Sequence, residues 1–91
     1  MADTEPAPSL IQFPSAFPIK VLGPQVEGFE VAMVALALQF DAQFDAQRIE
    51  RRPSSGGKYL GLTLTVTATS RDQLDALYRA LSAHPMVKVV L

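Results

Sequence analysis

The chain of 91 residues contains no cysteine, no tryptophan and no asparagine, and His84 is its single histidine. Without cysteine, neither a disulfide framework nor a thiolate site for zinc or an iron–sulfur cluster can form. One histidine also excludes a multi-histidine metal site within one chain. Neither a Ser–His–Asp set nor a catalytic carboxylate pair is recognisable from the residue spacing. We therefore expect no resident metal, no cofactor and no enzymatic activity.

The sequence also lacks an excess of charge of either sign and a long hydrophobic run. It has 8 Lys and Arg against 9 Asp and Glu, a net charge of −1, which argues against a generally basic nucleic-acid-binding protein. The longest apolar run, from Val31 to Leu38, is far shorter than the roughly 20 residues of a membrane span. The first residues do not show the basic and then apolar pattern of a signal peptide. We expect a cytoplasmic protein with no membrane segment.

Hydrophobic periodicity predicts a single domain over residues 17–91 that follows a proline-rich, flexible tail over residues 1–16. The expected strands are 17–23, 45–52, 58–69 and 86–91, and the expected helices are 25–40 and 70–83. Strand 58–69 is the clearest element, because leucine and valine alternate with threonine along it. Ser70 and Gln73 have the spacing of a capping box at the start of the second helix.

The resulting order is βαββαβ. Right-handed crossover connections place both helices on the same face of one sheet. The sequence therefore predicts an α+β fold of the ferredoxin-like type, with an antiparallel sheet in the order 4-1-3-2.

The first predicted helix has apolar residues on two sides. One stripe consists of Val26, Phe29, Met33, Leu36 and Phe40. The second consists of Val31, Val34 and Leu38. A surface helix needs only one such stripe. The second stripe indicates either tolerated exposure or a self-association surface of a homodimer.

The predicted open face of the sheet is polar. Its candidate residues are Lys20, Arg48, Thr63, Thr65 and Lys88. RNA-recognition modules of the same topology stack bases on aromatic residues of the central strands, where this chain has threonines, so we do not expect RNA binding. The face is either an ordinary solvated surface or a docking surface for an anion, a partner protein or a second sheet.

A basic, glycine-containing turn is a second candidate site. Residues 48–58 carry four basic residues and one acidic residue, a local charge of +3. Backbone amides in such a turn can bind an anion, although a hairpin loop with solvated charges explains the same composition. The candidate anion or partner site consists of Arg51, Arg52, Ser54, Ser55, Gly56, Gly57, Lys58 and Tyr59.

The chain resembles the YbeD-like family of small bacterial proteins of uncharacterised function over roughly residues 12–91. The matching residues are Phe13-Pro14, Phe17, Lys20-Val21-Leu22-Gly23, Pro53-Ser54-Ser55, Gly57, Tyr59, Ala68-Thr69, Gln73, Leu77-Tyr78, Leu81 and the ending Val87 to Leu91. The chain departs from the family pattern at Gly56 and Lys58, where the lysine of the loop is displaced. The resemblance implies a ferredoxin-like fold similar to ACT-type regulatory domains, and it supplies no catalytic residues.

Two functional hypotheses remain open from the sequence. The first is a non-enzymatic regulatory module, similar to ACT domains, that binds a small ligand such as an anion. The alternative is an adaptor that docks on a partner protein through residues 51–59 and the open face of the sheet.

Overall fold

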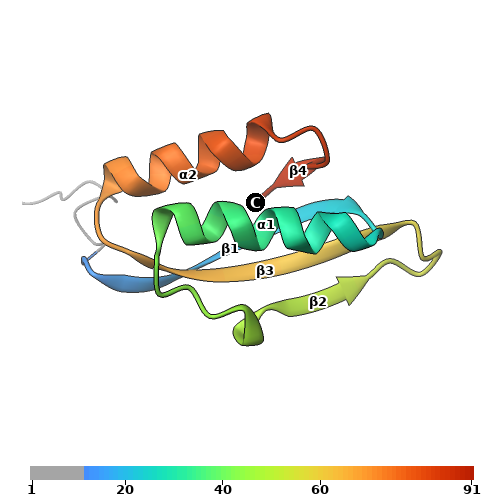
Figure 1. The fold of residues 1–91 in the computed structure, drawn as a ribbon, viewed down its shortest axis with the longest axis horizontal. Coiled ribbons are helices and arrows are strands. Elements are labelled where there is room, and N and C mark those ends of the chain that lie inside the picture. The colour runs from blue at the N-terminus through green and yellow to red at the C-terminus, as the bar shows by residue number, and fades with distance from the viewer. Residues whose placement is uncertain (1–11) are drawn as a thin grey trace, which may run out of the picture.

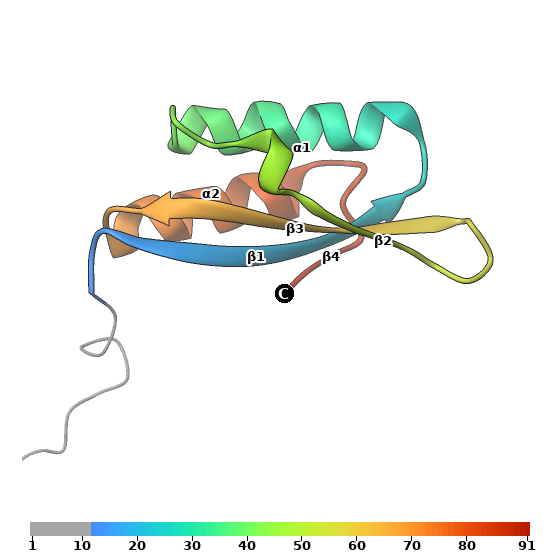
Figure 2. The ribbon, with the colours of Figure 1, turned by 90° about the horizontal axis from the view of Figure 1, so that it is seen from below.

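A computed structural model of the protein describes residues 12–91. Four strands, two α-helices and one short 3₁₀ helix follow one another along the chain: β1 (Ser15–Pro24), α1 (Glu27–Phe40), η2 (Ala46–Arg48), β2 (Glu50–Pro53), β3 (Tyr59–Ala68), α2 (Arg71–Ala83) and β4 (Val89–Val90). The strands form one antiparallel sheet in the order β2-β3-β1-β4. Both helices cover the same face of this sheet (Figures 1 and 2). The predicted α+β, ferredoxin-like arrangement is therefore confirmed.

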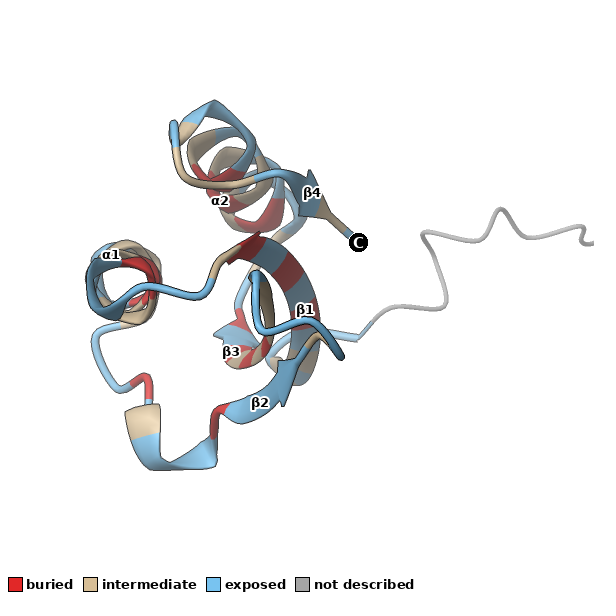
Figure 3. Cartoon of the chain, turned by 90° about the vertical axis from the view of Figure 1, so that its right-hand side faces the viewer, coloured by how far each residue is buried: buried red, intermediate tan, exposed pale blue. Residues whose placement is uncertain are grey.

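The core lies between the helices and the two central strands. β1 and β3 pair along their whole length, with Ile19 opposite Leu64 and Val21 opposite Leu62. These four side chains are at most 2% exposed, and they pack with the buried side chains of the helices. Figure 3 shows the alternation of buried and exposed residues along β1. The helical contribution comes from Phe29, Met33, Ala37, Leu74, Leu77 and Leu81.

The predicted capping box at the start of α2 is confirmed. The Ser70 hydroxyl accepts a hydrogen bond of 3.0 Å from the Gln73 amide. The Gln73 side chain reaches back and accepts one of 2.6 Å from the Thr69 amide. The same side chain donates at 2.7 Å to the carbonyl of Phe40, the last residue of α1. The Ser70 hydroxyl thus satisfies a free amide at the start of α2, and the Gln73 side chain satisfies a free carbonyl at the end of α1.

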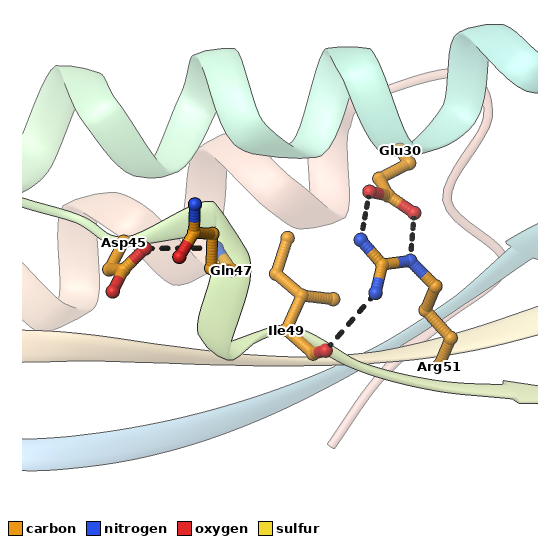
Figure 4. A network of polar contacts seen from close by, with 5 residues as sticks. All are labelled: Glu30, Asp45, Gln47, Ile49 and Arg51. Atoms are coloured by element: carbon orange, nitrogen blue, oxygen red, sulfur yellow. Dashed lines mark hydrogen bonds and ion pairs between the residues drawn. The ribbon is translucent and has the colours of Figure 1, made fainter.

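The predicted strand 45–52 is wrong in its first half. The Asp45 carboxylate accepts a hydrogen bond of 2.9 Å from the Gln47 amide, and a 3₁₀ turn follows (Figure 4). Such local side-chain bonds compete with strand pairing. The turn also inserts the buried Ile49 into the core. As a result, Arg48 lies in η2 and not on the open face of the sheet, as we had expected.

The last strand is shorter than predicted, and its faces are reversed. Alternation over residues 86–91 predicts that Val89 and Leu91 face the core and that Val90 faces outward. Val90 lies opposite the buried Val21 and packs against the core, whereas Val89 lies opposite Leu22 on the open face. The Lys88 amide donates to the Leu22 carbonyl at 2.7 Å, so Lys88 and Val89 together face one residue of β1. An extra residue of this kind is the signature of a β-bulge, and it changes which side chains point to each face.

Two boundaries near β1 also differ from the expectation. β1 begins at Ser15, inside the expected tail, and the rest of that tail up to residue 11 lies outside the described residues. β1 extends to Pro24, one residue beyond the expected strand, and α1 begins at Glu27, where we expected the helix to start at residue 25. Within residues 12–91, no helix has the length and hydropathy needed to cross a membrane.

Candidate ligand-binding site on the open sheet face

A hollow lies on the face of the sheet that the helices leave uncovered. Its lining includes Gly61, which occupies an outward position of the central strand β3 and has no side chain. Gly61 lies between Leu22 of β1 and Arg52 of β2 in the register of the sheet. A cavity of about 290 Å³ lies over these neighbours, and the absence of a side chain at Gly61 keeps its floor low. The main side chains around it are Lys20, Leu22, Arg52, Thr63, Val89 and Leu91.

The backbone at Gly61 does not itself require glycine. Among the described residues, only Gly57 has a positive φ, of 74°. A Cβ atom built on Gly61 would lie 3.5 Å from the Arg52 carbonyl oxygen, an ordinary van der Waals distance. Glycine inside a strand often marks a place where a ligand or another backbone approaches closely. Backbone conformation and packing therefore do not account for a glycine at position 61, whereas close approach of a ligand would.

The wall of the hollow toward β4 is apolar. Leu22, Val89 and Leu91 are 36%, 44% and 74% exposed. Leu91 reaches this face because its amide and carbonyl groups exchange hydrogen bonds of 2.7 and 3.2 Å with Lys20. Three exposed aliphatic side chains therefore meet beside the floor that Gly61 and Thr63 provide.

The charged residues of the hollow are Lys20, Arg52 and Glu50. Within residues 12–91, the one ion pair with an N–O distance of at most 4.0 Å joins Arg51 and Glu30 on the other side of the sheet. Lys20 and Arg52 thus have no carboxylate of the described chain within that distance. Lys88, also on the open side, places its ammonium group 5.5 Å from the centroid of the Tyr59 ring and can interact with the ring electrons.

The basic cluster expected over residues 51–59 is divided by the structure into three parts. Arg51 points to the covered side, where its guanidinium donates to both carboxylate oxygens of Glu30 at 2.7 and 2.6 Å (Figure 4). These charge-assisted hydrogen bonds lower the pKa of Glu30, and burial partly opposes them. The pKa of Arg51 is raised by the same contact. Arg52, the next residue, points to the open face and lines the hollow.

The remaining part of the cluster forms the turn between β2 and β3. The Ser54 hydroxyl accepts a hydrogen bond of 3.1 Å from the Tyr59 amide, and the Gly57 amide donates to the Ser54 carbonyl at 3.0 Å. The positive φ of Gly57 suits this turn. Ser55, Gly56 and Lys58 are exposed at its tip, which projects beyond the helices (Figures 1 and 2). The Ser54 hydroxyl and the Gly57 amide are thus engaged in closing the turn.

The structure places most of the residues predicted for the open face on one surface, whereas it separates the residues predicted for the turn. Lys20, Thr63 and Thr65 lie on the outward side of the two central strands, and Lys88 lies beside Tyr59 at the same face. Arg48 is the exception noted above. The prediction omitted Gly61 and the two apolar residues of the last strand. Glycine interrupts the leucine–threonine alternation of the strand, and this was a usable signal for Gly61. Val89 and Leu91 could not be predicted in the same way, because their side of the sheet depends on how β4 pairs with β1.

The second apolar stripe of α1 lies partly exposed. Val31 is 67% exposed and Leu38 is 42% exposed, whereas Val34 is half-buried against the core. The buried side of α1 carries Phe29 and Met33 as expected, but Val26 of the first stripe is 51% exposed at the N-cap. Self-association through Val31, Val34 and Leu38 stays a prediction.

No metal-ligand set is recognisable in the described part of the chain. Within residues 12–91, no three His, Asp or Glu side chains come together in a group that could hold an ion. The His84 side chain instead shapes the turn after α2, because its Nδ1 accepts a hydrogen bond of 3.1 Å from the Met86 amide. It does not cap the helix carbonyls with its side chain, as a histidine at a helix end often does.

Comparison with known proteins places the chain in a family. Residues 8–91 match the family model described as "Protein of unknown function (DUF493)". The chain is 64% identical to a UPF0250 protein of Leptothrix cholodnii over the full length of both chains. It is 64% identical to a UPF0250 protein of Ralstonia nicotianae over 97% of this chain and 91% of that protein. It is 57% identical to a UPF0250 protein of Bordetella pertussis over the full length of both. The resemblance to YbeD-like bacterial proteins is thereby confirmed, and the chain belongs to the DUF493 family.

Proposed function

We propose that this protein is a non-enzymatic module that binds a small ligand on the open face of its sheet, in the hollow over Gly61. The observation that carries the proposal is the break in the outward row of β3. Tyr59, Thr63 and Thr65 carry side chains in that row, whereas Gly61 has none and is one of the residues that line a cavity of about 290 Å³. This volume is near the lower end of the range of small-molecule sites.

Two further features support a binding role. The hollow combines an apolar wall with a small number of polar groups, which is the usual composition of small-molecule sites. Its floor and nearest walls belong to β1 and β3, whose ten-residue pairing is the longest in the sheet. A site on rigid strands holds its geometry more closely than a site on a loop.

The test is a titration of isotope-labelled protein with amino acids, short carboxylic acids and nucleotides, followed by backbone amide shifts. We expect at least one compound to move the amides of Leu22, Gly61 and Thr63 together. Gly61→Val places an isopropyl group on the floor of the hollow and should abolish those shifts. The matched control is Thr67→Val, which introduces the same residue on the same face of β3, outside the hollow.

Equal shifts in the wild type and in Gly61→Val would overturn the proposed site. A titration in which no compound moves the three amides would count against the proposed function itself.

A partner-docking adaptor is the second candidate, supported by the projecting turn between β2 and β3. Ser55, Gly56 and Lys58 are exposed there, and Lys58 presents a positive charge at the tip. Alanine replacements of Ser55 and Lys58 should then reduce capture of a specific partner and leave the amide shifts at Gly61 unchanged. Undiminished capture would count against the turn as the docking element.

Self-association through Val31, Val34 and Leu38 is a separate part of the proposal. Replacing Val31 and Leu38 with glutamate should lower the sedimentation mass if these side chains join two copies. A wild-type protein that sediments as a monomer at all concentrations would exclude this interface.

A further inference from the structure

We infer that the ligand of this hollow is a small organic acid with a short aliphatic chain, whose carboxylate lies toward Lys20 and Arg52 and whose chain lies on Leu22, Val89 and Leu91. The inference rests on the proposed function and specifies the chemical class of its ligand.

The charge of the site supports an anion. The side chains that face the hollow include two cations, Lys20 and Arg52, and one acidic group, Glu50, whereas the guanidinium of Arg51 is paired with Glu30. Neither cation has an ion-pair partner within 4.0 Å among residues 12–91. An arginine guanidinium can bind a carboxylate with two parallel hydrogen bonds, and the ammonium group of a lysine adds a compact charge. Thr63 contributes a hydroxyl group on the floor.

The apolar wall supports an aliphatic chain and argues against a purely inorganic anion. Leu22, Val89 and Leu91 are all more than a third exposed, although they gather on one side of the cavity. Covering such surface contributes roughly 25 cal/mol per Å² of apolar area removed from water. Phosphate or sulfate would leave this wall exposed, whereas an aliphatic acid would cover it.

The same charges disfavour a second copy of this face as the occupant. A two-fold interface brings a patch against a copy of itself. Each copy would contribute three cationic side chains, Lys20, Arg52 and Lys88, and one acidic lining side chain, Glu50, so the buried side-chain charges would be unbalanced. A small acid satisfies the cations without this repulsion, and the cavity of about 290 Å³ suits a compact molecule.

The experiment compares three probes that have the same alkyl chain: hexanoate, hexan-1-ol and hexylamine. Binding is followed by the amide shifts of Leu22, Gly61 and Thr63 in the full chain. We expect hexanoate to bind most tightly, with a Kd in about the millimolar range for so small a molecule. Added salt should weaken hexanoate binding and leave hexanol binding nearly unchanged.

Lys20→Gln and Arg52→Gln should each weaken hexanoate binding by about three- to tenfold. Lys58→Gln removes a lysine from the projecting turn, outside the hollow, and should leave the affinity unchanged. Acetate, which has the same head group and almost no chain, should bind more weakly than hexanoate.

Three other outcomes would contradict the inferred ligand class or the inferred position of its carboxylate. Equal affinity for hexanoate and hexanol, or no shift with hexanoate, would overturn the inferred class. If another compound from the wider titration still moved the three amides, and Gly61→Val abolished that shift, the proposed binding function would stand without this ligand class. A larger loss from Lys58→Gln than from Lys20→Gln would move the anion site to the turn.

Discussion

The two faces of β3 differ in what occupies them, although their residues alternate along one strand. On the covered face, Leu62, Leu64, Val66 and Ala68 are almost fully buried beneath the helices. On the open face, Gly61, Thr63 and Thr65 are only partly buried, and Tyr59 lies beside Lys88. Strand geometry dictates the alternation, whereas the helices decide which side becomes core.

The two faces of β3 should differ in how well they tolerate side-chain substitutions. Side chains on the covered face have neighbours on every side, so a change of one methyl group is felt. The open face has no layer above it in the described structure, and its central position carries no side chain. Stability and the proposed binding function therefore depend on opposite sides of the same strand.

The sharpest way to test this division is to truncate neighbouring residues of β3. Leu64→Ala should lower the free energy of unfolding by about 2–5 kcal/mol, because it leaves a cavity in a fully buried site. Thr65→Ala, on the open face, should cost at most about 1 kcal/mol, mainly through lower strand propensity. Urea unfolding of both variants measures the contrast, and equal losses would show that the faces do not differ as described.

Gly23 of β1 and Gly61 of β3 allow the packed and the open side of the sheet to be compared with smaller expected changes in stability. A Cβ on Gly23 would collide with the Phe29 ring and lie 2.7 Å from the Met86 carbonyl oxygen. Gly23→Ala should therefore destabilise the protein by about 1–3 kcal/mol through overpacking. Gly61→Ala meets no contact closer than 3.5 Å and should be neutral or stabilising by up to about 1 kcal/mol.

Thermal unfolding of the two alanine variants is sufficient to check the pair. A destabilised Gly61→Ala would mean that the hollow over Gly61 is not free space, and it would weaken the proposed site as well.

The smallest expected effect concerns the ion pair that joins α1, on the covered side, to the edge strand β2. Hydrogen bonding to Arg51 lowers the pKa of Glu30 in the folded protein. The stabilisation is therefore complete above the ordinary pKa of a carboxyl group, and it is lost as the pH falls through the lowered value. Both side chains are partly exposed, so solvent screening keeps the contribution small.

Urea unfolding of the wild type and Glu30→Gln should show a gap in stability at neutral pH that narrows on acidification. Glu27→Gln is the control, because Glu27 is exposed on the same helix and has no ion pair within the described residues. A gap that does not change with pH would show that the Glu30 carboxylate is not stabilised by Arg51.

The fold was predictable because its strongest elements are governed by local rules. The alternation in β3, the capping residues Ser70 and Gln73, and the βαββαβ order were sufficient to derive the sheet topology. The errors fall where local hydrogen bonds override the pattern. Asp45 starts a 3₁₀ turn inside an expected strand, and the bulge at Lys88 reverses the faces of β4.

The candidate site was only partly predictable. Lys20, Thr63 and Thr65 were placed on the open face from alternation alone. Arg51 and Arg52 look equivalent in the sequence, yet the structure separates them, because neighbouring strand residues point to opposite faces and only Arg51 meets Glu30. The apolar wall depends on the register of β4, which no periodicity of so short a segment can specify.

The amino-acid sequence by itself determined the class of this protein, its sheet order and the absence of thiolate chemistry, because these follow from composition and from residue periodicity. Only the tertiary structure decided which cations share a surface. It also placed Gly61 between Leu22 and Arg52 at the floor of a hollow. The physical reason is that a site is made by pairing between distant segments. The register and phase of that pairing are set by packing and by individual backbone hydrogen bonds.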